Sequence, residues 1–349
     1  MTNPIKMLGL SLTGRCNYKC IYCYAQDHCQ AEMSYEIAAK ALSLAAGPTE
    51  DNSFVVQFTG GEPLLAFPLL KKIVSLVEHK HYKARLQIQT NGSLVTDDIA
   101  RYLFKHKIAI GVSLDGRPQV NNKTRKLANG EGASNATLRG ITVLRNNNIG
   151  IGITCVVSDE NVRELPGIVE MAYYLGNVRK IGFDLLRGQG RGGNLLPASA
   201  RDVRMAVQAT YALSDKMRTL TKQSIEFSQI HNVKVVESCG EQYHFGHCYA
   251  MNGNAAFVDA KGDIYACSSL IGNPDFYLGT VEQGIDAQKL QKVQATIQAA
   301  MNFCTNCPDF NSCGGGCFAR WYGTGKKKAY EAECSLKRLS IAWAHENRK

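Results

Sequence analysis

The chain has 349 residues, of which 45% are hydrophobic and 20% charged, which excludes a disordered chain and predicts one large domain with a smaller one. Its formal net charge of +10 favours an acidic partner, but the basic run 326–328 has no accompanying recognition helix or aromatic ladder, and we predict no nucleic-acid site there. No run of 18 apolar residues and no signal-peptide pattern occurs, so we predict a cytoplasmic protein that neither spans nor binds a membrane.

From residue 7 to about 187, apolar runs alternate with amphipathic segments. The apolar runs predict strands at Leu8–Thr13, Phe54–Thr59, Leu86–Thr90, Ile108–Leu114, Ile149–Val157 and Ile181–Leu186. Helices are predicted near 35–46, 68–79, 97–106, 134–147 and 161–175. Six strand–helix units of this length predict an α/β fold with a parallel sheet.

Polar or glycine-rich motifs follow four of these predicted strands. Cys16 follows the first, Thr59–Pro63 the second, Thr90–Gly92 the third, and Ser113–Gly116 the fourth. In parallel α/β barrels the active site lies at the carboxyl-terminal rim of the strands. We therefore expect these motifs to meet at one site.

Three cysteines, Cys16, Cys20 and Cys23, lie close together after the first predicted strand. Three thiolates at gaps of three and two residues can hold an iron–sulfur cube while one iron keeps no protein ligand. An ordinary electron-transfer cluster uses four cysteines instead. A zinc knuckle or three unrelated buried thiols are the alternatives.

The chain contains 13 cysteines, eight of them in the last 111 residues. Cytosolic thiols stay reduced, so this number indicates metal ligation rather than disulfides. A glycine-rich loop at 188–198 and a helix at about 199–222 precede this second cysteine-rich region. We predict a barrel with a bridging helix over 1–224 and a cysteine-rich domain over 225–349.

The triplet, with Tyr22 before its third cysteine and with Gly60, Gly61 and Glu62 after the second predicted strand, resembles the radical S-adenosylmethionine (SAM) enzymes. This resemblance implies a partial (β/α)6 TIM barrel. It also implies that the open iron binds SAM and that a reduced cluster cleaves it to a 5′-deoxyadenosyl radical, which abstracts a hydrogen atom.

The same resemblance implies a set of SAM contacts. Glu62 would accept hydrogen bonds from the methionine ammonium, Arg125 would pair with the SAM carboxylate, and Ser113 would contact ribose or carboxylate. Tyr22 and Leu186 would contact adenine; a surface arginine and a core leucine are the alternatives for Arg125 and Leu186. The predicted cofactor-binding residues are Tyr22, Gly60, Gly61, Glu62, Asn91, Ser113, Arg125 and Leu186. No catalytic acid or base is assigned.

The C-terminal cysteines resemble the SPASM extension of radical SAM peptide and protein maturases. The matching residues are Cys248, Cys267, Cys304, Cys307, Cys313, Cys317 and Cys334, with Gly262 before Cys267. The resemblance implies two auxiliary clusters, an outer one on Cys304, Cys307, Cys313 and Cys334 and an inner one on Cys248, Cys267 and Cys317. Cys239 is the predicted fourth inner ligand; Glu241, His244, His247 or a substrate thiolate are alternatives. A zinc ribbon is the main alternative for the whole array.

Three 4Fe–4S clusters would lower the net charge to about +5, which still favours an acidic flavodoxin or ferredoxin as low-potential reductant. An auxiliary cluster can accept an electron from a substrate radical, which completes a two-electron oxidation. Cluster ligation also helps a cysteine-rich domain to fold.

The substrate is predicted to be a ribosomally made peptide that acquires a thioether or carbon–carbon crosslink or is epimerised. Because the barrel begins near residue 7, we expect leader recognition by the barrel rim or by a separate protein. The alternative is a sulfatase maturase that forms formylglycine, although Ser268 stands where that branch carries an aspartate base. A small-molecule oxidase related to tetrapyrrole-modifying enzymes and a non-catalytic cluster scaffold are further alternatives.

Overall fold

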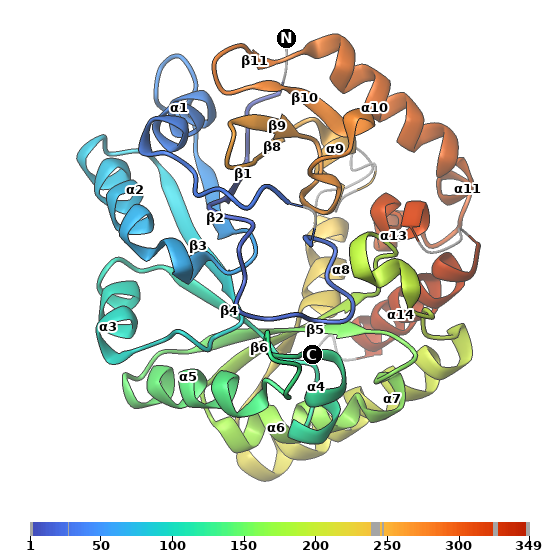
Figure 1. The fold of residues 1–349 in the computed structure, drawn as a ribbon. Coiled ribbons are helices and arrows are strands. Elements are labelled where there is room, and N and C mark those ends of the chain that lie inside the picture. The colour runs from blue at the N-terminus through green and yellow to red at the C-terminus, as the bar shows by residue number, and fades with distance from the viewer. Residues whose placement is uncertain (1–2, 27, 239–244, 246–247, 324–326, 347–349) are drawn as a thin grey trace.

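The computed structural model describes residues 3–26, 28–238, 245, 248–323 and 327–346. Strands curve around a centre and helices cover their outer side, as Figure 1 shows. The six barrel strands are β1 (Met7–Ser11), β2 (Phe54–Thr59), β3 (Ala84–Thr90), β4 (Ala109–Ser113), β5 (Ile151–Val157) and β6 (Val178–Leu185). They pair in chain order and in parallel, which confirms the predicted α/β partial barrel.

The barrel helices lie close to their predicted positions. They are α1 (Tyr35–Ala46), α2 (Phe67–His79), α3 (Asp97–Lys105), α4 (Pro118–Thr124), α5 (Ser134–Asn146) and α6 (Pro166–Leu175). Ser34 and Thr96 cap α1 and α3, each accepting a hydrogen bond from the third backbone N–H that follows. The predicted helix at 161–175 is divided into a 3-10 turn, Val162–Glu164, and α6, whose first residue is Pro166. Proline suits that first position because it lacks an N–H.

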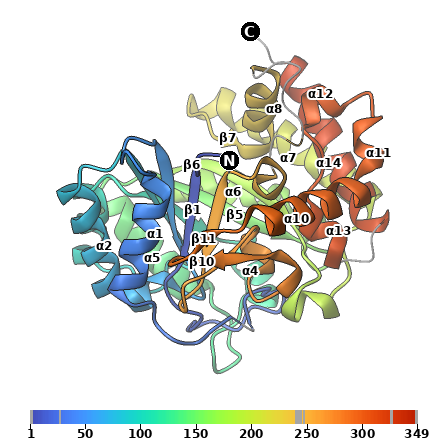
Figure 2. The same cartoon turned by 90° about the horizontal axis from the view of Figure 1, so that it is seen from above.

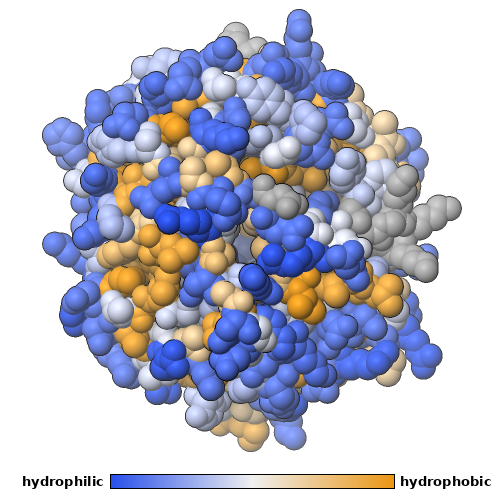
Figure 3. Space-filling model, in the orientation of Figure 1, coloured by the Kyte–Doolittle hydropathy of each residue, from blue (hydrophilic) through white to orange (hydrophobic). Residues whose placement is uncertain are grey.

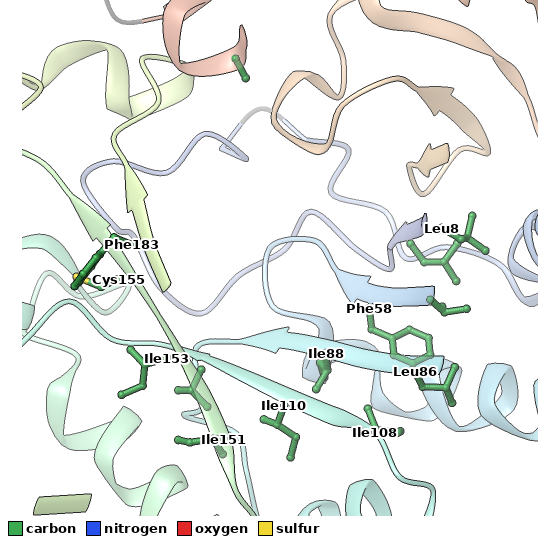
Figure 4. Packing of buried hydrophobic residues seen from close by; sticks show 14 of the residues in the cluster. Leu8, Phe58, Leu86, Ile88, Ile108, Ile110, Ile151, Ile153, Cys155 and Phe183 are labelled. Carbon is green, nitrogen blue, oxygen red and sulfur yellow. The ribbon is translucent and has the colours of Figure 1, made fainter. Parts of the chain in front are cut away.

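Alternating burial along the strands separates the two faces of the sheet. On β2, Phe54, Val56 and Phe58 are buried, whereas Gln57 between them and Thr59 after them are only half-buried. The buried set packs between the strands and the outer helices in a large core (Figure 4). The half-buried set faces the barrel interior, which is therefore partly polar.

Chain segments after residue 225 extend the barrel sheet at both ends. Strand β7 (Glu226–Phe227) pairs with β6, and β8 (Ala255–Val258) pairs in parallel with β1. Antiparallel strands β9 (Asp263–Tyr265), β10 (Tyr277–Thr280) and β11 (Gly284–Ile285) follow β8. The division at residue 224 stays a prediction.

The remaining helices lie beside the barrel. They are α7 (Ala200–Thr221), α8 (Ser228–Ser238), α9 (Tyr249–Asn252), α10 (Ala287–Ala300), α11 (Asn302–Thr305), α12 (Phe310–Cys313), α13 (Phe318–Gly323) and α14 (Lys327–Glu346). Helix α14 packs against both α7 and α8, and Figure 2 shows the three together. Among the described helices, none combines the length and apolar character needed to cross a membrane.

Candidate active site

The loop that follows β1 carries Cys16, Cys20 and Cys23 and crosses the centre of the view in Figure 1. The surface of the same face is hollowed near its centre (Figure 3). Backbone hydrogen bonds fasten the loop: Lys19 N donates to Lys126 O at 2.7 Å, and Ile21 N donates to Thr124 O at 2.9 Å. The loop that carries the cysteines is thus held by the segment after α4.

Two of the three thiols lie beside groups that can donate hydrogen bonds to cluster-bound sulfur. Cys20 is buried, which raises the pKa of its thiol to about 11, and Arg125 Nη1 donates to its sulfur at 3.8 Å. Tyr18 N donates to Cys16 Sγ at 3.4 Å. Within the described part of the chain, no three His, Cys, Asp or Glu side chains form a group that could hold a metal ion. A four-iron cube is wider than one metal ion, so the thiolates that bind it stand farther apart than the ligands of a single ion. Soft sulfur donors beside N–H groups and an arginine fit such a cluster.

Gly60 and Gly61 are needed by the cysteine loop itself. A Cβ on Gly60 would lie 2.2 Å from Thr13 O, and one on Gly61 would lie 2.3 Å from Arg15 O. Gly60 also has a φ of +135°, which favours glycine, and Gly61 N donates to Thr13 O at 2.8 Å. The glycine pair therefore lets the end of β2 and the loop lie backbone against backbone. A direct contact of these glycines with SAM stays a prediction.

Glu62 is fully buried and joins the end of β2 to the end of β3. Its Oε1 accepts from Thr90 Oγ1 at 2.7 Å and from Leu64 N at 3.0 Å, and its Oε2 accepts from Asn91 N at 2.7 Å. Burial raises the pKa of the carboxyl, and these donors partly offset that rise. Asn91 Nδ2 in turn donates to Asn17 Oδ1 at 2.9 Å in the cysteine loop. The predicted SAM contacts of Glu62 and Asn91 stay predictions.

Asp115, which lies in the motif Ser113–Gly116 but had no predicted role, is the centre of a buried network behind the loop. It accepts from Tyr22 Oη at 2.5 Å, from Thr124 Oγ1 at 2.7 Å and from Val156 N at 3.0 Å. Its Oδ2 lies 3.2 Å from Arg125 Nε in an ion pair whose side chains are 0% and 7% exposed. One carboxylate thus connects β5, the segment after α4 and the cysteine loop.

This network places Tyr22 and Arg125 close together. The Arg125 guanidinium carbon lies 5.4 Å from the centroid of the Tyr22 ring, and Arg125 also reaches Cys20. Arg125 is buried, which excludes the alternative of a surface arginine. Its pairing with a SAM carboxylate and the adenine contact of Tyr22 stay predictions.

Ser113 and Leu186 lie in different surroundings. Ser113, the last residue of β4, is half-buried and accepts from Gln89 Nε2 at 2.9 Å. Leu186 is buried in a small apolar cluster that includes Tyr22 and Ala133. Leu186 packs as a core residue beside the cysteine loop, and the SAM contacts of both residues stay predictions.

The C-terminal cysteines that the SPASM resemblance assigns to one cluster lie close enough to influence one another's pKa. Burial raises the pKa of Cys248 to about 12, and the nearby Cys317 and Cys267 thiols raise it further. Burial raises the pKa of Cys334 to about 11, and Cys313 and Cys304 add to that rise. Cys307 acts on Cys313 in the same way. The structure thus brings together Cys248, Cys267 and Cys317 in one group, and Cys304, Cys307, Cys313 and Cys334 in another; their roles as ligands stay predictions.

A cavity of about 310 Å³ lies at the first group. Cys248, Cys267 and Cys317 line it, together with Cys313 of the second group, Ser268 and Arg187. The first three thiols fit an inner auxiliary cluster at this cavity. The predicted fourth ligand, Cys239, lies outside the described residues, as do the alternatives Glu241, His244 and His247.

Four charged residues near this cavity were also missed: Asp184, Arg187, Arg320 and Glu333. The signal in the sequence that could have identified these four residues was their position. Asp184 and Arg187 flank the end of the sixth predicted strand, Arg320 follows Cys317 by three residues, and Glu333 precedes Cys334. Such positions are also common for surface charges, so only the fold shows that the four side chains meet.

A parallel partial barrel with a three-cysteine loop at its mouth defines a class of cluster-dependent enzymes, and comparison with known proteins gives the family. Residues 10–172 match the model of the radical SAM superfamily. A protein of Methanocaldococcus jannaschii, MJ0907, is 31% identical over 274 residues, which cover 78% of this chain and 88% of that protein. The chain belongs to the radical SAM superfamily. The predictions of family and of enzyme are confirmed, and this superfamily uses a 4Fe–4S cluster with SAM.

Two further relatives have named activities. The serine-type anaerobic sulfatase-maturating enzyme of Klebsiella aerogenes is 27% identical over 345 residues, 93% of this chain and 82% of that enzyme. The Fe-coproporphyrin III synthase of Methanosarcina barkeri is 30% identical over 215 residues, 59% of this chain. The match spans only 52%, about half, of that synthase.

Two solved structures share the fold. One, described as native anSMEcpe with bound AdoMet and Cp18Cys peptide, matches with a TM-score of 0.77 at 19% identity over 99% of this chain and 100% of that chain. The other, Streptococcus suis SuiB bound to precursor peptide SuiA, matches with a TM-score of 0.66 at 15% identity over 94% of this chain and 75% of that chain. The likeness includes the cysteine-rich C-terminal part.

Proposed function

We propose that this enzyme is a radical SAM maturase that modifies a peptide or protein and carries two auxiliary clusters beside its catalytic one. The observation that carries the proposal is the gathering of seven C-terminal cysteines in one part of the fold, four of them, Cys248, Cys267, Cys313 and Cys317, around one cavity. The fold of two maturases whose structures contain peptides supports the substrate class.

In this proposal, the residues of the chain have distinct tasks. Cys16, Cys20 and Cys23 hold the catalytic cluster, and Glu62, Ser113 and Arg125 orient SAM beside it. When bound, the cluster and SAM supply a 5′-deoxyadenosyl radical for hydrogen-atom abstraction. Burial of Arg125 and Glu62 keeps water away from these polar contacts, which strengthens them.

The inner group, Cys248, Cys267 and Cys317, together with Cys239, would hold a cluster that accepts an electron from the substrate. The outer group would hold the third cluster. A peptide crosslink or epimerisation and formylglycine formation both fit this arrangement. Sulfatase maturation is a second candidate because the match to the Klebsiella enzyme covers 93% of this chain. Ser268 at the cavity, in place of an aspartate, weighs against that reaction.

The experiment measures iron and sulfide in anaerobically reconstituted protein and 5′-deoxyadenosine formed with dithionite as reductant. We expect about 12 irons per chain and SAM cleavage. Cys16→Ala should abolish that cleavage, and Cys155→Ala, at a buried cysteine outside every predicted ligand set, is the matched control.

About 4 irons, or zinc in the C-terminal sites, would contradict the auxiliary clusters. Full iron without SAM cleavage, even with peptides present, would favour a scaffold. The product masses from two sets of substrates then distinguish peptide crosslinking or epimerisation from formylglycine formation. The substrates are peptides encoded by neighbouring genes and sulfatase peptides with Cys or Ser. A flavodoxin or ferredoxin that replaces dithionite would identify the reductant, and a separate leader-binding protein would appear as a requirement for turnover.

A further inference from the structure

A buried chain of ion pairs connects the barrel to the C-terminal helices. Arg187 Nη1 donates to Asp184 Oδ2, and Arg320 Nη2 donates to Asp184 Oδ1 at 2.7 Å. Arg320 Nη1 donates to Glu333 Oε1 at 2.6 Å. Asp184 lies on β6, Arg320 on α13 and Glu333 on α14, and each of the four side chains is at most 20% exposed.

This chain of ion pairs lies directly against the inner cysteine group. Glu333 accepts from Cys317 N at 3.1 Å, and Arg187, Arg320 and Glu333 line the same cavity as Cys248, Cys267 and Cys317. Burial raises the pKa of Cys267 and Arg187 opposes that rise, while the Cys317 sulfur adds to the carboxylates that raise the pKa of both arginines. Both guanidinium groups are therefore within electrostatic reach of the sulfurs.

Arg187 differs from Arg320 in how far its charge is compensated. Arg320 binds two carboxylates, whereas Arg187 forms an ion pair with one, Asp184, among the described residues. The Arg187 guanidinium carbon also lies 5.6 Å from the centroid of the Tyr24 ring, next to Cys23. Arg187 is thus the less compensated cation, between the catalytic loop and the inner cysteine group.

Stability alone does not explain such an arrangement. A buried ion pair loses about as much in desolvation as it gains in attraction, and well-packed apolar residues hold two elements together equally well. The reduction potential of an iron–sulfur cluster, in contrast, depends directly on nearby charge and on hydrogen bonds to its sulfurs. A cation beside the cluster stabilises the form that carries one more electron.

We propose that Arg187 is a positioning and tuning residue for the inner auxiliary site, where its charge raises the reduction potential and makes the site a better one-electron acceptor. The inference rests on the proposed function, because it requires a cluster on Cys248, Cys267 and Cys317. The electron comes from the substrate radical during turnover and from dithionite in the test.

The test is an anaerobic redox titration of the holoenzyme, followed by electron paramagnetic resonance, with iron counted in each sample. Arg187→Met removes the charge at similar side-chain length, and Arg187→Lys keeps it. Arg117→Met, at an exposed arginine paired with Glu164 and Glu170, is the matched control. Spectra of Cys304→Ala, which lacks an outer-cluster ligand, separate the inner from the outer signal.

We expect Arg187→Met to shift the inner-cluster potential to a more negative value, while Arg187→Lys and Arg117→Met stay close to the wild type and the outer-cluster potential is unchanged in all three. An inner potential that is unchanged in Arg187→Met at full iron content overturns the inference. If Arg187→Met fails to load iron, Arg187→Gln, whose amide can still donate to Asp184, decides by the same criterion. Wild-type protein without an inner-cluster signal would instead refute the proposed function.

Discussion

Replacing Asp115 tests whether one carboxylate holds the catalytic loop in place. Asp115→Ala removes the acceptor for Tyr22 Oη, Thr124 Oγ1 and Val156 N, and it leaves the buried Arg125 without its counterion. None of these groups is freely accessible to water, so hydration does not offset the lost hydrogen bonds and ion pair.

The expected cost follows from the burial of the pair. Breaking a buried ion pair by removing one partner costs about 3–5 kcal/mol, because an uncompensated charge stays behind. Each hydrogen bond to a charged acceptor contributes about 1.5–3 kcal/mol, but the three are coupled and do not add in full. We therefore expect Asp115→Ala to lower the free energy of unfolding by about 4–5 kcal/mol, a large part of the about 5–15 kcal/mol typical of a folded domain.

The assay is urea unfolding under anaerobic conditions, followed by far-ultraviolet circular dichroism, with iron content measured in parallel. Asp51→Ala is the control, because Asp51 is 71% exposed and pairs with Lys83 at the surface; it should cost less than about 1 kcal/mol. The double variant Asp115→Ala/Arg125→Met should lose at least about 0.5 kcal/mol less than the two single losses added together. Strict additivity, or a loss for Asp115→Ala no larger than that for Asp51→Ala, would refute the reasoning.

Three further changes test other parts of the structure. Gly61→Ala should lower iron content and SAM cleavage, because its Cβ would lie 2.3 Å from Arg15 O. Gly152→Ala is the control and should leave both unchanged, because no atom would lie nearer than 3.9 Å to its Cβ. Normal iron content in Gly61→Ala would contradict the close approach. Cys304→Ala should reduce iron from about 12 to about 8 per chain and impair maturation but spare much of the SAM cleavage; equal loss of both would mean that the clusters mainly hold the fold. Burial raises the pKa of Asp184, but Arg187 and Arg320 more than offset this rise and hold the pKa below its usual value of about 3.9. The ion pairs of Asp184 therefore stabilise the fold above that pH, and this stabilisation is lost as the pH falls through the lower folded-state pKa. Asp184→Asn should therefore lower the urea midpoint of cluster-free protein most at pH 7, and this loss should shrink as the pH falls below about 3.9; a loss that does not depend on pH would exclude the ion pairs as its source.

The strands and helices of the barrel could be predicted because their patterns are local. The β2 and α1 boundaries agree with the sequence pattern, since turn or capping residues stop the periodicity at both ends. Strand β6 begins three residues earlier than predicted, at Val178, because the charged pair Arg179 and Lys180 interrupts the apolar run while the backbone continues to pair with β5. The joining of β8 to β1 could not be predicted, because the contact spans about 250 residues of sequence and four strand residues carry little periodicity.

The candidate site shows the same division. Cysteine spacing is a local pattern, and its resemblance to the SPASM extension implied two C-terminal ligand groups, whose roles stay predictions. Asp184 was missed, and Asp115 received no role within the motif Ser113–Gly116, because a single aspartate near the end of a strand is most often a turn or surface residue. Only the fold reveals that Asp115 is buried, that the Asp184 side chain is 20% exposed, and that each faces an arginine.

The two aspartates use one physical arrangement at two sites. Asp115 follows β4 and pairs with Arg125, which reaches Cys20; Asp184 on β6 pairs with Arg187, which acts on Cys267. A carboxylate behind each guanidinium fixes its direction toward sulfur, but it also cancels part of the positive charge. Removing the carboxylate should therefore raise the reduction potential of the nearby cluster, and removing the arginine should lower it. Asp115→Asn and Arg187→Met are thus expected to shift the reduction potentials of their respective clusters in opposite directions. If these pairs had a purely structural role, the direction of each shift would not depend on the charge that was removed.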